Sequence, residues 1–165
     1  MPRVIIAGSR KATYEQTRAA VVSCEWFMER VVKRQPCTIV SGKAPGSDAH
    51  GEEIARRLTR ASGVEWPVAE FPADWGRLGK FAGPARNRQM AEFAAAGEGE
   101  AWLIAAWDRR IQGTANMIAE AYAHGIQVHV YDTVRRCVAD MARESEWAAR
   151  YPRGADGEML WWRWY

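Results

Sequence analysis

The stretch Val4-Ile5-Ile6-Ala7-Gly8-Ser9-Arg10-Lys11 decides the fold that we expect for this chain. Four consecutive apolar residues closed by a glycine are typical of a strand that is buried on both faces, as in a parallel sheet. A loop of hydroxyl and cationic residues follows directly, and apolar residues at helical spacing begin after Thr13, a fair N-cap. The order of strand, polar loop and helix is the first half of a βαβ unit.

The same order recurs along the chain. Further strands are predicted at residues 37–40, 65–71, 102–106 and 126–131, and helices at residues 14–34, 48–62, 84–96 and 114–124. This alternation predicts an α/β fold, a Rossmann-like three-layer αβα sandwich with a mostly parallel sheet of about five strands. We expect a nucleotide-binding domain over residues 1–132 and a separate C-terminal segment over residues 133–165.

The C-terminal segment combines an amphipathic stretch, residues 134–150, with the ending Met159-Leu160-Trp161-Trp162-Arg163-Trp164-Tyr165. Four aromatic residues among the last five would favour aggregation if they were exposed. We therefore expect a helix and a Trp-rich tail that pack on the domain or at a dimer interface. A base-stacking surface for single strands is the alternative.

The composition narrows the class of protein. A formal net charge of +3 and a pI near 8.9 are lower than a dedicated nucleic-acid binder usually carries, so nucleic acid is a permitted but not a favoured partner. Three cysteines without a CxxC pair indicate neither a disulfide framework nor a zinc site. No apolar stretch is long enough to cross a bilayer. We expect a cytoplasmic protein without a membrane partner.

The loops after the first four strands carry the functional prediction. Loops at the carboxyl ends of parallel strands gather at one edge, where helix amino termini offer unpaired N–H groups to a ligand. Glycine lets the backbone approach such a ligand, and cationic and hydroxyl side chains donate to phosphate. We expect a phosphate-bearing nucleotide there, bound by Gly8, Ser9, Arg10, Gly42, Lys43, Gly46, Ser47, Asp48, Trp75, Lys80, Arg86, Asn87, Asp108, Gly113 and Thr114.

Each loop also has a purely structural interpretation. The first loop lacks the full G-x-G-x-x-G pattern and is alternatively a tight turn with solvated cations, while the second has glycine and lysine in the wrong order for a Walker A loop. Asp48 either binds a ribose hydroxyl or caps its own helix, and capping is the commoner role.

The long segment of residues 72–87 is the most informative, because long loops in compact domains are usually functional. Trp75 is a candidate platform for a base, Lys80 and Arg86 are candidates for phosphate, and Asn87 is a candidate for a polar ligand edge. The alternative is that Trp75 closes a small satellite core and Arg86 pairs with a carboxylate.

The loop residues also form an ordered pattern. Its members are Gly8-Ser9-Arg10, then Gly42, Gly46 and Asp48, then Pro72, Trp75, Gly79, Ala82, Gly83, Arg86, Asn87 and Met90, and finally Trp107, Asp108, Gly113, Thr114, Met117 and Ile118. In these motifs, over roughly residues 3–131, the chain resembles the YspA-like branch of the SLOG superfamily. These are Rossmann-like nucleotide-binding proteins related to the LOG phosphoribohydrolases and to the DprA/Smf proteins. The resemblance implies sensing of a nucleotide or a nucleotide-derived ligand such as ADP-ribose, no required cofactor, and a homodimer.

The chain departs from the family pattern in two places. Arg109 and Ile111 stand where the pattern has glycine and serine, which puts the ligand's identity and affinity in question. LOG enzymes carry a glutamate where this chain has Met117, beside Asn116, and neither residue supplies a carboxylate base. Glu120 lies one helical turn further on, where we expect it to face solvent.

We therefore favour binding over hydrolysis and predict no catalytic residue and no metal ligand. The first alternative is a LOG-like phosphoribohydrolase, an N-glycosidase that acts on nucleoside monophosphates. The second is DprA-like binding of single-stranded DNA.

Overall fold

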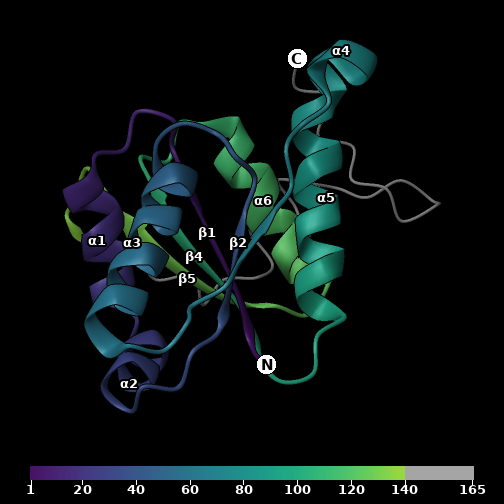
Figure 1. Ribbon diagram of the computed structural model, residues 1–165. Coiled ribbons are helices and arrows are strands. Elements are labelled where there is room, and N and C mark those ends of the chain that lie inside the picture. The colour runs from purple at the N-terminus through teal and green to yellow at the C-terminus, as the bar shows by residue number, and fades with distance from the viewer. Residues whose placement is uncertain (140–165) are drawn as a thin grey trace.

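The computed structural model describes residues 1–139, in which strands and helices alternate along the chain (Figure 1). The strands are β1 (Arg3–Gly8), β2 (Thr38–Ser41), β3 (Val68–Glu70), β4 (Ala101–Trp107), β5 (Gln127–Asp132) and β6 (Cys137–Val138). The helices are α1 (Tyr14–Val22), α2 (Glu25–Val32), α3 (Ser47–Ser62), α4 (Trp75–Leu78), the 3₁₀ helix η1 (Gly79–Phe81), α5 (Ala82–Ala95) and α6 (Gln112–Ala123).

The six strands form one mostly parallel sheet in the order β3-β2-β1-β4-β5-β6. Only β6 runs antiparallel to its neighbour, β5. The central strand β1 pairs with β2 on one side and, from Arg3↔Ala101 to Gly8↔Ala106, with β4 on the other. The strand order therefore reverses between β1 and β4, and α/β sheets bind ligands beyond the carboxyl ends of the strands at such a point.

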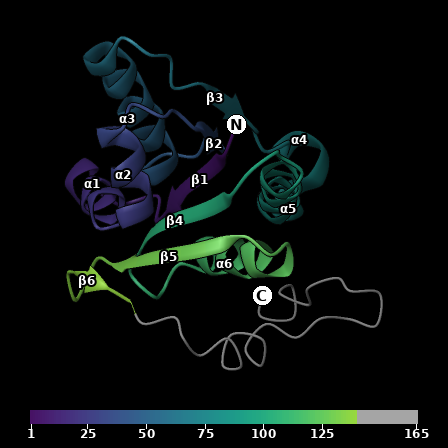
Figure 2. The same ribbon diagram turned by 90° about the horizontal axis from the view of Figure 1, so that it is seen from below.

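Helices cover both faces of the sheet, as predicted for a Rossmann-like fold (Figure 2). On one face α1, α2 and α3 pack against Ile6 and Ile104, and on the other α5 and α6 pack against Ile5 and Leu103. Alternate residues of β1 and β4 thus enter different cores, and all four of these side chains are buried. Burial on both faces explains the continuous apolar runs of these strands.

The structure differs from the prediction in the first helical segment. Residues 14–34 form two helices instead of one, because Cys24 has an extended backbone and is buried between them. At this break, the Ser23 hydroxyl donates a hydrogen bond to the Ala20 carbonyl oxygen and forms another with Nε2 of His129 on β5. Apolar residues keep their helical spacing through this break, so periodicity does not reveal it.

The C-terminal segment begins differently from the expected helix. The carboxylate of Asp132 accepts hydrogen bonds from the backbone N–H groups of Val134 and Arg135, which closes a turn. Cys137–Val138 then returns as β6, so the sheet has six strands rather than about five. The predictions for the rest of this segment, including the Trp-rich tail, lie outside the described residues. Within residues 1–139, no helix has both the length and the apolar character that a bilayer crossing requires.

Candidate functional site

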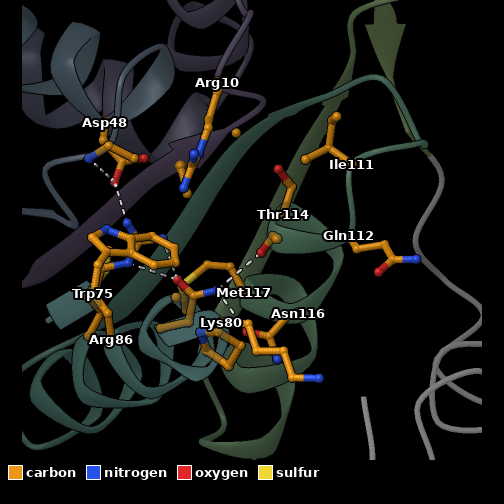
Figure 3. Close-up of a pocket in the computed structure, with 18 of the residues that line it drawn as sticks. Arg10, Asp48, Trp75, Lys80, Arg86, Ile111, Gln112, Thr114, Asn116 and Met117 are labelled. Atoms are coloured by element: carbon orange, nitrogen blue, oxygen red, sulfur yellow. Dashed lines mark hydrogen bonds and ion pairs between the residues drawn. The ribbon is translucent and has the colours of Figure 1, made fainter. Parts of the chain in front are cut away.

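A cavity of about 720 Å³ lies at the carboxyl edge of the sheet, between β1, the loop after β2, α5 and α6 (Figure 3). Figure 1 shows this edge at the end of the molecule opposite the N-terminus, where α4 and the start of α5 stand. The lining residues are Ala7, Gly8, Arg10, Ala44, Asp48, Trp75, Lys80, Gly83, Pro84, Arg86, Asn87, Met90, Arg110, Ile111, Gln112, Gly113, Thr114, Asn116 and Met117. Its size is that of sites for nucleotide-sized ligands.

Two glycines bring the first two loops together at this edge. A Cβ atom on Gly8 would lie 2.3 Å from the Ala106 carbonyl oxygen and 2.4 Å from the Ser47 hydroxyl. Gly46 has a left-handed backbone, with φ of 82°, and a Cβ there would lie 2.4 Å from the Ser9 carbonyl oxygen. Side chains at these two positions would hold the start of α3 away from the loop after β1.

Arg86 joins the floor of the cavity to the loop after β2. Its Nη1 donates to the Gly42 carbonyl oxygen at 2.9 Å and lies 3.9 Å from Asp48 Oδ2, while its Nη2 donates to Asn87 Oδ1 at 2.9 Å. The side chain is 13% exposed. The pairing of Arg86 with a carboxylate, which the sequence left as an alternative, is therefore present, and Arg86 lines the cavity as well.

Asn87 continues this network into α6. Its Nδ2 donates to Asn116 Oδ1 at 2.8 Å and to the Gly113 carbonyl oxygen at 3.1 Å. Both ends of the Asn87 amide are thus engaged within the protein, although the residue lines the cavity. Asn87 holds α5 and the first turn of α6 in register, and in this arrangement it is not a free polar edge for a ligand.

The charges that line the cavity favour an anion. Arg10, Lys80, Arg86 and Arg110 are cationic, and Asp48 is the one carboxylate among the described lining residues. Burial lowers the pKa of Arg86, Asp48 opposes this shift, and the positive charge of Arg10 adds to it. A bound anion would relieve both the burial cost and the repulsion between Arg10 and Arg86.

The pKa of Asp48 shifts in the opposite direction to that of Arg86. Burial raises the pKa of this carboxyl, while the Arg86 guanidinium and the N–H groups of Ala44 and Gly42 act to lower it. The net shift is upward, because these partners do not fully replace the water that the carboxylate has lost.

The start of α6 offers hydrogen-bond donors to the cavity. Its N-cap, Ile111, makes no side-chain capping bond, and the first N–H groups of a helix lack intrahelical partners. Thr114 Oγ1 and Asn116 Nδ2 are buried and have no hydrogen-bond partner among residues 1–139. An unpaired buried donor costs about 1–3 kcal/mol, and both of these donors belong to residues that line the cavity.

Trp75 stands at the mouth of the cavity and is 50% exposed. The guanidinium carbon of Arg10 lies 5.4 Å from the centroid of its ring. A ring that is half exposed does not close a satellite core, which was the structural alternative for this residue. It leaves an aromatic face on which a base could stack.

Six of the predicted residues do not line the cavity: Ser9, Gly42, Lys43, Gly46, Ser47 and Asp108. Lys43 Nζ instead binds Glu52 Oε2 at 2.9 Å and Glu70 Oε1 at 3.0 Å. Ser47 is fully buried and its hydroxyl bonds that of Thr17 at 3.1 Å. The side chains of Lys43 and Ser47 therefore serve the fold.

The other four lie near the edge without reaching the cavity. Asp108 Oδ1 accepts hydrogen bonds from the N–H groups of Arg110 and Ile111, which shapes the loop after β4. Gly42 and Gly46 act through their backbones, as described above. Ser9 is 4% exposed, and its hydroxyl has no hydrogen-bond partner among the described residues.

Sequence reasoning did not select several lining residues. Arg110 follows β4 as Arg10 follows β1, so a cation soon after a buried strand was the available signal. Met90 and Met117 supply apolar wall, and they were noted only as positions of a motif. For Asn116 the sequence showed only that no carboxylate stands at this position, and it gave no sign that the amide nitrogen is buried and unpaired among the described residues.

The expected exposure of Glu120 was wrong, because this residue is only 7% exposed. Its helix packs into the core, and its Oε2 lies 3.8 Å from His124 Nδ1 rather than at the cavity. Residues 1–139 also contain no group of three His, Cys, Asp or Glu side chains placed to share a metal ion. Comparison with family models, with curated proteins and with solved structures finds no match for this chain.

Proposed function

We propose that this protein binds a nucleotide or a nucleotide-derived ligand, such as ADP-ribose, in the cavity at the carboxyl edge, and that binding serves sensing. The observation that carries the proposal is the pair of unpaired buried donors, Thr114 Oγ1 and Asn116 Nδ2, in a cavity with four cationic side chains and one carboxylate. A phosphate satisfies donors and cations together, since it is an anion with several acceptor oxygens.

The proposed ligand lies across the cavity. Its phosphate meets the first N–H groups of α6, Thr114 and Arg110, and its base stacks on Trp75. Figure 3 supports this direction, because Thr114, Ile111 and Gln112 stand on one side of the cavity and Trp75 on the other. Exposed aromatic faces are common base-stacking platforms in nucleotide sites.

The N-glycosidase alternative lacks a carboxylate at Met117, and Glu120 lies away from the cavity. Release of a free base from a nucleoside monophosphate, abolished in Glu120→Ala, would restore it. Single-stranded DNA binding predicts instead an affinity that falls steeply with salt. A homodimer in the cytoplasm remains part of the proposal, and light scattering measures the oligomeric state.

A thermal-shift panel tests the proposal with AMP, GTP, NAD, ADP-ribose, inorganic phosphate and a short single-stranded oligonucleotide. A nucleotide at a hundred times its Kd stabilises the fold by about 2.7 kcal/mol, which raises Tm by about 5 to 10 °C in a domain of this size. The proposal fails if no nucleotide raises Tm.

Two matched variants locate the ligand. We expect Arg110→Ala to weaken nucleotide binding about tenfold, because it removes one charged contact to phosphate. Lys43→Ala removes a cation from the loop after β2 that binds Glu52 and Glu70 outside the cavity, and should leave the affinity unchanged. Equal losses in the two variants would mean that overall charge, not the cavity, attracts the nucleotide.

A further inference from the structure

Asp48 does not cap its own helix, although capping is the commoner role for aspartate at this position. Its Oδ2 accepts from the N–H of Gly42 at 2.9 Å and from the N–H of Ala44 at 3.4 Å, both of which precede it in the chain. The N-cap of α3 is Gly46, which makes no side-chain capping bond. The carboxylate therefore holds the loop after β2, and it uses a single oxygen to do so.

The second oxygen of Asp48 remains available at the cavity. The residue is 4% exposed and lines the cavity, yet no donor among residues 1–139 forms a hydrogen bond with Oδ1. Figure 3 shows one carboxylate oxygen joined by dashed lines and the other directed toward the side where Arg10 lies. A carboxylate oxygen that is largely withdrawn from water and lacks a donor is costly, so a donor from a ligand would stabilise it.

The chemistry of that donor follows from charge. A phosphate cannot lie against the carboxylate of Asp48, because the two negative charges repel each other in a buried site. A neutral hydroxyl can donate to Oδ1 at no electrostatic cost. In the proposed orientation the phosphate meets α6 and the base meets Trp75. Figure 3 shows Asp48 on the same side as Trp75 and across from Thr114, so the sugar next to the stacked base is the part of the nucleotide that can reach Asp48.

We propose that Asp48 Oδ1 accepts a hydrogen bond from a ribose hydroxyl, and that the cavity thereby selects ribonucleotides over deoxyribonucleotides. This inference rests on the proposed function, and it adds a specificity-determining residue to it. A hydrogen bond to a charged acceptor is strong enough to make binding about 10- to 100-fold weaker when the hydroxyl is removed.

Calorimetric titration of the full chain with AMP, 2′-deoxy-AMP and 3′-deoxy-AMP tests the inference directly. We expect at least one deoxy form to bind about 10- to 100-fold more weakly than AMP. Equal affinities for all three would overturn the inference and leave the proposed function standing. No binding of any of the three, together with no shift in the thermal panel, would overturn both.

Two variants assign the selection to Asp48. In Asp48→Asn we expect the preference for AMP to fall to within about threefold of unity, since a neutral amide is a weaker acceptor and can donate instead. Glu52→Gln makes the same change one turn further along α3, at a residue that binds Ser41 and Lys43 and does not line the cavity. It should keep the full preference. A preference that survives in Asp48→Asn, or that disappears in Glu52→Gln, contradicts the assignment.

Discussion

Residues 42–47, the loop after β2 up to the start of α3, and residues 108–114, the loop after β4 with the start of α6, contain the same kinds of residue: glycine, a cation and a small hydroxyl side chain. In the first, Lys43 binds Glu52 and Glu70, and Ser47 binds Thr17. In the second, Arg110 and Thr114 line the cavity. The strand β2 lies beside the edge strand β3, whereas β4 adjoins β1 where the strand order reverses. Loops of similar composition thus differ in where their cationic and hydroxyl side chains lie: those of Lys43 and Ser47 contact the protein itself, whereas those of Arg110 and Thr114 line the cavity.

Arg86 holds the loop after β2, and its loss should have the largest effect. Arg86→Ala leaves the Asp48 carboxylate buried without its cation and removes the donor to the Gly42 carbonyl oxygen. We expect the free energy of unfolding to fall by about 3 kcal/mol, measured by urea denaturation. Arg56→Ala is the control, because Arg56 lies on α3 and pairs with Glu53 at the surface.

The control should change the free energy of unfolding by no more than about 0.5 kcal/mol, as exposed ion pairs usually do. If both variants unfold at the same urea concentration, Arg86 does not hold the loop after β2, and the difference between the loops has another origin.

The next largest effect should come from Gly46, whose replacement by alanine should destabilise the fold more than the same change at Gly113. Gly46→Ala places a Cβ 2.4 Å from the Ser9 carbonyl oxygen at a left-handed φ of 82°, so we expect a loss of about 2 kcal/mol in the free energy of unfolding. Gly113 lies in α6, and a Cβ there would point into open space, with nothing within 4 Å beyond its own helical turn. Gly113→Ala should change stability by no more than about 0.5 kcal/mol. A loss in Gly113→Ala as large as that in Gly46→Ala would contradict the contrast.

The smallest expected effect is on the pH dependence of stability, and it comes from the ion pair of Arg109 and Asp132 that anchors the loop after β4. Arg109 has a left-handed φ of 64°, and its Nε lies 2.8 Å from Asp132 Oδ2. Burial alone would raise the pKa of Asp132, but the N–H groups of Arg135 and Val134, together with Arg109, hold the pKa below its ordinary value. The resulting stability is present above the unfolded pKa, about 4, and is lost as pH falls through the lower folded pKa.

Asp132→Asn should therefore be less stable than the parent protein at pH 7 and lose less stability on acidification. Urea denaturation between pH 3 and pH 7 measures this. Asp48 contributes with the opposite sign: its folded pKa is raised, so its contribution falls as pH rises from about 4 toward that folded pKa. An identical pH dependence in Asp132→Asn and the parent would exclude the anchoring role of Asp132.

Local sequence predicted the strands and helices well where burial is uniform. The apolar runs of β1 and β4 are buried on both faces, so their composition alone identifies them. The break between α1 and α2 was missed, because the apolar spacing continues through it. The hydrogen bond of Ser23 with His129, 106 residues further along the chain, cannot be read from the local sequence.

The candidate site was predictable only as a set of loops. Strand order determines which loops face the cavity, and it does not follow from any single segment. Lys43 illustrates the limit, since its partners Glu52 and Glu70 stand 9 and 27 residues further along the chain. From the sequence pattern, a cation in such a loop is a candidate for binding a ligand. Tertiary contacts determine whether it pairs instead with a carboxylate of the same chain.

The central position of β1 has a consequence for how the protein is made. Ribosomes complete this strand first, and its partner β2 follows at Thr38, yet its second partner, β4, begins only at Ala101, paired with Arg3. At about 5–20 residues per second, the nascent β1 waits on the order of 5 to 20 s for β4. Until then its apolar side chains lack one neighbour, and α6, which completes the cavity, has not been synthesised. Folding around this strand must therefore be a late event governed by contacts distant in sequence.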